Sequence, residues 1–98
     1  MSIQYLDPEN RWSEATIFNN TLYYTSVLEN LEGDIHQQTT SALHAIDNIL
    51  ARVGSNKSHI LDATIFLADK VDLAGMNQVW DSWVSLVKPR FAVQYKLF

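Results

Sequence analysis

The chain has 98 residues, of which 47% are hydrophobic and 11% aromatic, and a formal net charge of −4 at pH 7. This length allows one domain with a modest core, and the apolar content excludes a disordered or low-complexity chain. The negative charge and the lack of a Lys/Arg cluster argue against a partner made of nucleic acid. The absence of cysteine excludes a thiol nucleophile, a disulfide framework and a thiolate metal site. We expect a single domain over residues 1–98, soluble and cytoplasmic, because no basic leader and no apolar run of about 20 residues is present.

The first third of the chain has the pattern of antiparallel strands. A short strand at residues 3–6 is expected to be followed at once by a turn. Residues 15–18 and 21–28 are apolar and β-branched, with Asn19 and Asn20 between them. Asparagine tolerates positive φ, so these two segments are predicted to form a hairpin with a two-residue turn.

Two segments with helical periodicity follow. In the first, Asp34 can cap the N-terminus while Gln37 reaches back from the third position, and Gly54 suits the residue after the last turn. The second helix is predicted to start at about Asp72 and to end before Pro89.

Two further strands complete the predicted order of three strands, helix, strand, helix, strand. Residues 60–68 are apolar on both faces, which predicts a strand in the middle of a sheet, covered on both sides. The segment from Arg90 to Leu97 alternates in polarity, which is typical of a half-buried strand. Two helices cover only one face of a four- or five-stranded mixed sheet, so we expect another subunit on the opposite, apolar face.

Arg90 is the best candidate for chemistry among the seven cations. An arginine that follows a proline and starts a strand is a rigid, two-pronged donor for a carboxylate or phosphate, although it can equally be a surface cation paired with a nearby acid. Trp12 lies in an irregular segment, where a large ring needs either a pocket or a partner. We expect no metal site, because His36, His44 and His59 lack the spacing of a chelating set. No nucleophile elbow or phosphate-binding glycine loop is present.

Five segments carry a family resemblance that spans about residues 2–94. They are RWSEA at 11–15, LYYTS at 22–26, DIHQQT at 34–39, ATIFLAD at 63–69 and Met-Asn at 76–77. Together they resemble the Rid family of reactive-intermediate deaminases, also called the YjgF or L-PSP family, and its small bacterial YoaB-like subgroup in particular.

The resemblance implies an α/β (α+β) chorismate-mutase-like fold of order βββαβαβ, with two helices packed on one face of a mixed sheet. It also implies a homotrimer with ligand sites in the clefts between subunits. In catalytic members an arginine, matched here by Arg90, holds the carboxylate of a 2-imino or enamino acid. Water then hydrolyses the substrate to a 2-keto acid and ammonia, and no cofactor or metal is expected. A two-pronged grip of this kind fixes the substrate and favours its electron-poor iminium form.

Other positions match the family's ligand site residue by residue. Asn77 corresponds to an asparagine near the site, and Trp12 takes the place of an aromatic residue that lines it. Thr25 and Ser26 fall on the strand that contributes backbone contacts. Phe91 stands where many members have a small residue, and its bulk is expected to narrow the pocket.

The C-terminal segment departs from the family pattern. Members continue past the arginine into a further strand that ends with an acidic residue, which handles the water. This chain ends at Phe98 without a carboxylate after Arg90, so we expect the final strand of the family to be missing through a truncated or frame-altered tail. The expected function is therefore an enamine/imine deaminase. A non-catalytic protein that binds a small carboxylate is the alternative, and the endoribonuclease or translation inhibitor of the family's older name fits the acidic chain least.

Overall fold

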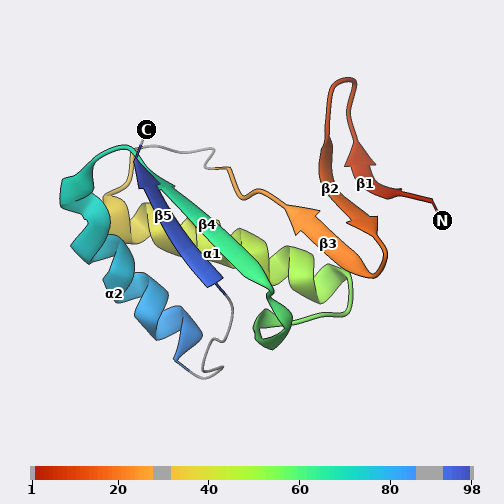
Figure 1. Ribbon diagram of the computed structural model, residues 1–98. Helices are drawn as coiled ribbons and strands as arrows, with labels where there is room; N and C mark the ends of the chain where they lie inside the picture. Colours follow the sequence, from red (N-terminus) through yellow and green to blue (C-terminus); the bar gives the residue numbers. More distant parts are fainter. Residues whose placement is uncertain (1, 28–31, 86–91, 98) are drawn as a thin grey trace.

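The computed structural model of the protein describes residues 2–27, 32–85 and 92–97. The principal elements are β1 (Gln4–Pro8), β2 (Ser13–Phe18), β3 (Thr21–Tyr24), α1 (Ile35–Arg52), β4 (Asp62–Leu67), α2 (Leu73–Val84) and β5 (Ala92–Leu97) (Figure 1). Two short 3-10 turns, η1 (Lys57–His59) and η2 (Lys70–Asp72), precede β4 and α2. This order confirms the predicted α/β fold.

The first three strands form an antiparallel meander, β1-β2-β3. Asn19 and Asn20 have φ values of 53° and 61°, which confirms the two-residue hairpin turn between β2 and β3. Strand β1 runs on to Pro8, past the expected start of the turn, because Pro8 still pairs with Ser13. Asp7, just before it, has a φ of 48°, a value that aspartate accepts more readily than most residues.

Helix α1 begins and ends where its capping residues place it. The Asp34 carboxylate accepts a hydrogen bond from the Gln37 backbone N–H at 2.8 Å, and the Asp34 N–H donates to the Gln37 side chain at 2.9 Å. At the other end Gly54 has a φ of 77°, which stops the helix. Both predicted ends are confirmed. No helix in the described part of the chain is long and apolar enough to cross a membrane.

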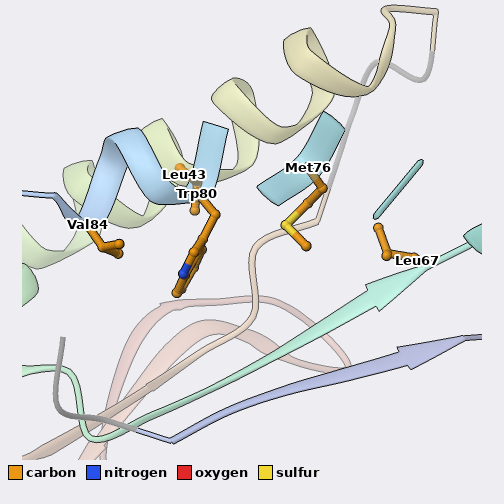
Figure 2. Close-up of a cluster of buried hydrophobic side chains, with 5 residues drawn as sticks. All are labelled: Leu43, Leu67, Met76, Trp80 and Val84. Carbon is orange, nitrogen blue, oxygen red and sulfur yellow. The ribbon is translucent and has the colours of Figure 1, made fainter. Parts of the chain in front are cut away.

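The main core lies between the two helices and β4. Figure 2 shows the side chains of five buried residues pointing toward one another from α1, β4 and α2: Leu43, Leu67, Met76, Trp80 and Val84. Partly buried Ala63 and Ile65 of β4 and Val93 of β5 pack against this cluster. The helices therefore cover one face of the β4–β5 pair, as predicted.

The strands form two sheets, β1-β2-β3 and β4-β5, so β4 differs from the expected central strand. Within the described residues β4 has β5 as its one neighbour, in parallel register from Asp62 opposite Ala92 to Leu67 opposite Leu97. Its outer face is open, since Phe66 is 54% exposed. An apolar run specifies an extended strand, but the number of neighbours depends on which other segments the chain supplies.

The chain leaves more surface in water than a compact monomer does. Its accessible area is 7493 Å², whereas the usual scaling for a monomer of 11.2 kDa gives about 5,700 Å². The radius of gyration is 14.2 Å, against about 12.6 Å expected for this length. Among the described residues no large side chain is fully buried. The core of a single chain is therefore incomplete.

Candidate ligand site

The candidate site starts from the segment that joins α2 to β5. Arg90 and Phe91 lie in residues 86–91, outside the described residues. The position of β5, the strand that follows them, is described. Its parallel pairing with β4 sets Ala92 opposite Asp62 at the start of β4. Ala92, two residues after Arg90, therefore lies opposite a residue that carries a carboxylate.

Three polar residues line the outer face of the sheet at this end, away from the helices. They are Asp62 and Thr64 of β4 and Gln94 of β5, all exposed. In the amide orientation that its neighbours require, the Gln94 side-chain nitrogen donates to Asp62 Oδ1 and to the Ala63 carbonyl oxygen, each at 2.9 Å, and lies 3.3 Å from the Thr64 hydroxyl oxygen. This group can present an acid and an amide to a ligand or a water.

Sequence reasoning missed Asp62, because it looked for an acid after Arg90 along the chain. The parallel register of β4 and β5 brings an earlier acid to the same end of the sheet. The signal was present in the predicted strand–helix–strand order, since a strand, a crossover helix and a second strand of one sheet give parallel pairing.

Trp12 and Asn77 lie in distant parts of the chain. Trp12 is 63% exposed in the turn between β1 and β2, where its carbonyl oxygen accepts a hydrogen bond from the Glu9 N–H at 2.6 Å. Asn77 is partly buried in α2. Figure 1 shows the β1–β2 turn and α2 at opposite sides of the molecule. One chain therefore does not bring these two predicted site residues together.

Thr25 and Ser26 follow the end of β3. Thr25 is exposed, whereas the Ser26 hydroxyl donates to the Ala42 carbonyl oxygen of α1 at 3.0 Å. Ser26 thus ties the end of β3 to the middle of the long helix. This contact gives Ser26 a structural role that the sequence did not suggest.

Two of the histidines, His36 and His59, make polar side-chain contacts. His36 Nε2 lies 2.7 Å from Gln78 Oε1, which joins α1 to α2, and His59 Nδ1 lies 3.4 Å from the Ser55 hydroxyl. Along α1, a shallow open depression is lined by His36, Gln37, Thr40, Ser41 and His44. Across the described ranges, no three His, Asp or Glu side chains gather closely enough to hold a metal ion.

Three strands in a meander and a β-α-β unit, with helices on one face, define an α/β protein of the YjgF fold. A solved structure described as a member of the YjgF protein family, from Neisseria meningitidis, superimposes with a TM-score of 0.82 at 38% identity, over 100% of this chain and 80% of that chain. A structure from Salmonella typhimurium, 50% identical, gives a TM-score of 0.80 over 98% of this chain and 81% of that chain.

Residues 2–97 match the family model described as Endoribonuclease L-PSP. The RutC family protein YoaB of Escherichia coli K12 is 49% identical over 110 residues, which cover 99% of this chain and 96% of that protein. The chain therefore belongs to the endoribonuclease L-PSP family, as the resemblance indicated. Because the alignment runs over 110 positions and this chain has 98 residues, at least 12 positions of YoaB have no counterpart here.

Proposed function

We propose that the protein is an enamine/imine deaminase that hydrolyses a reactive 2-imino or enamino acid to a 2-keto acid and ammonia. The observation that carries the proposal is family membership over residues 2–97, a stretch that includes Arg90 within its Pro-Arg sequence. Arginine binds a carboxylate through two parallel N–H donors and stays charged at any physiological pH. Arg90 is the proposed carboxylate clamp of the substrate.

The reaction needs little beyond a fixed substrate and a positioned water. An enamino acid first tautomerises to the imine, as a proton moves from nitrogen to its β carbon. Water then adds to the C=N carbon, a proton moves to nitrogen, and the C–N bond of the resulting carbinolamine breaks to leave the keto group and ammonia. Arg90 contributes by holding the substrate in one orientation. The reaction with water then behaves as a step within one complex, so less entropy is lost on the way to the transition state. Asp62 pairs with Ala92, the first residue of β5. We assign to the Asp62 carboxylate the transfer of the proton of the attacking water.

The site is proposed to form between subunits of a homotrimer. Trp12 and Asn77, both matched to the family's ligand site, lie on opposite sides of a single chain. If they belong to one site, they come from different chains. One face of the β1-β2-β3 sheet carries both Tyr5 and Tyr23, which pair through Thr16. These side chains are 57% and 58% exposed, and such an open face supports the assembly. Exposed aromatic surface of this kind commonly marks an interface.

The test is release of keto acid from an imine that a separate enzyme generates in the assay. The protein is expected to speed this release. Arg90→Ala is expected to lower kcat/KM by about 100-fold, because it removes two charge-assisted hydrogen bonds to the substrate. Lys96→Ala is the matched control, because it removes a cation farther along β5. Release at the background rate with the unaltered protein would defeat the proposal.

A non-catalytic carboxylate-binding protein is the second candidate. The observation in its favour is the absence of an acid after Arg90, together with the bulky Phe91 beside it. Calorimetry with a 2-keto acid separates the two, since binding that Arg90→Ala abolishes, without any turnover, supports this candidate over the deaminase. RNA cleavage is disfavoured by the net charge of −4.

A further inference from the structure

Within the ranges that the structure describes, β3 and β4 each have an edge without a partner strand, and these two edges face each other. Strand β3 pairs with β2 on one side, and β4 pairs with β5 on one side, so among the described residues each has one edge free. Figure 1 shows β4 between β5 and the meander, with the arrows of β3 and β4 pointing in the same general direction. The free edges of the two sheets are thus turned toward one another.

Helix α1 contacts the chain near the ends of both β3 and β4. Ser26, just after β3, is bonded to the Ala42 carbonyl oxygen at 3.0 Å. The next residue, Leu43, belongs to the same buried cluster as Leu67 at the end of β4. The ends of β3 and β4 therefore rest on neighbouring residues of one helix.

The β4 edge lacks three of the usual protections against strand addition, namely proline, lysine and a bulge. Edge strands are normally guarded by proline, by lysine or by a bulge. Strand β4 reads DATIFL, with neither proline nor lysine, and its pairing with β5 runs without a bulge. By contrast, β1 ends in Pro8 and β5 carries Lys96.

The amount of chain that is lacking matches one strand. At least 12 positions of YoaB have no counterpart in these 98 residues, and a strand of about 6 residues with its connections needs a segment of that size. The accessible area of 7493 Å² exceeds that of a compact monomer by about 1,800 Å², which is more than the roughly 800 Å² that each partner buries in a standard interface.

We propose that the paired free edges of β3 and β4 take up an extended peptide strand from another molecule, laid over α1. Its main chain would bond to both edges, as in β-strand addition. Alternate side chains would point to the helix and to solvent, so apolar residues should alternate with polar ones. Because Asp62 begins β4, Asp69 lies two residues beyond its end and the net charge is −4, lysine at each end of the peptide is favoured. This binding activity does not depend on the deaminase proposal.

The probe is the acetylated and amidated peptide Lys-Val-Thr-Val-Thr-Val-Lys, and its matched control has proline in place of the central valine. Proline removes a main-chain donor and cannot sit within a central strand. Bound peptide is expected to slow amide hydrogen exchange about 10-fold or more in both β3 and β4, while β1 stays unchanged. Equal protection by the proline peptide, protection of only one of the two edges, or none would overturn the proposal.

Cross-linking tests the same placement through side chains, because the native chain has no cysteine. Tyr23→Cys on β3 and Thr64→Cys on β4 each introduce a single thiol beside a free edge. Tyr5→Cys is the control, since Tyr5 is 57% exposed against 58% for Tyr23 and pairing through Thr16 places both on one face. The probe with cysteine in place of its second threonine, supplied as a mixed disulfide, provides the partner.

Each rate of exchange with the peptide disulfide is divided by the rate with a small disulfide reagent, which corrects for access to the thiol. The corrected rates for Tyr23→Cys and Thr64→Cys are expected to exceed that of Tyr5→Cys at least 10-fold. Circular dichroism establishes that the three variants fold alike. Corrected rates that are equal at all three positions would contradict a bound strand between β3 and β4.

Discussion

Asp7 and Arg52 tie the first strand to the end of the long helix. Two guanidinium nitrogens donate to the two Asp7 carboxylate oxygens at 2.6 and 2.9 Å. These hydrogen bonds to Arg52 hold the pKa of the Asp7 carboxyl below its ordinary value. The pair is exposed, so it orients β1 more than it stabilises the chain.

Asp7→Asn is expected to lower the urea midpoint slightly at pH 7. A lowered carboxyl pKa gives stability that is present above the ordinary aspartate range, about pH 4, and is lost as the pH falls through the folded-state pKa. The difference from the unaltered protein should therefore vanish in acid and shrink at high salt. Asparagine also tolerates the positive φ at position 7, so the change tests the charge alone.

Glu9→Gln is the control for this measurement, because it removes the same charge from a nearby exposed position. A difference between Asp7→Asn and the unaltered protein that persists unchanged at acid pH would contradict the role given to the ion pair.

At the scale of the elements, Gly75 sets how closely α1 and α2 approach. A methyl group at this position would lie 2.6 Å from Ile35 Cγ2, so either the Ile35 side chain or the helices would have to shift. The sequence offered no reason to single out Gly75, because the contact joins residues of two helices.

Gly75→Ala is expected to lower the free energy of unfolding by about 1–3 kcal/mol through overpacking. The prediction runs against local preference, since alanine favours an isolated helix by about 1 kcal/mol. Chemical denaturation measures the change. Combining it with Ile35→Ala should cost less than the two single changes together, because the clashing methyl group is then absent. A more stable Gly75→Ala protein would show that the two helices do not meet closely at this point.

Local signals predicted most elements well. The paired asparagines gave the hairpin, and the Asp34–Gln37 capping box and Gly54 gave both ends of α1. Such signals act within a few residues, so a sequence carries them directly. The surroundings of β4 were predicted less well, because its neighbours depend on segments elsewhere in the chain.

For the whole molecule, the exposed sheet face leads to a prediction of self-association. Sedimentation velocity at micromolar concentration is expected to show a trimer, and the double variant Tyr5→Ser/Tyr23→Ser is expected to shift it toward monomer. Val71→Ser is the control, because Val71 is 78% exposed but lies in η2, away from this face. A monomer in the unaltered protein would contradict the proposed assembly.

The sequence by itself determined the order of strands and helices, the capped ends of α1, the family and the arginine of the proposed site. These follow from periodicity, from turn and cap chemistry, and from short motifs. Tertiary structure alone decided that β4 has a free edge among the described residues, that Asp62 lies beside the start of β5, and that Trp12 and Asn77 lie far apart in one chain. The physical reason is that strand pairing and helix packing join residues distant along the chain, and their partners are chosen by which segments are present to compete for them.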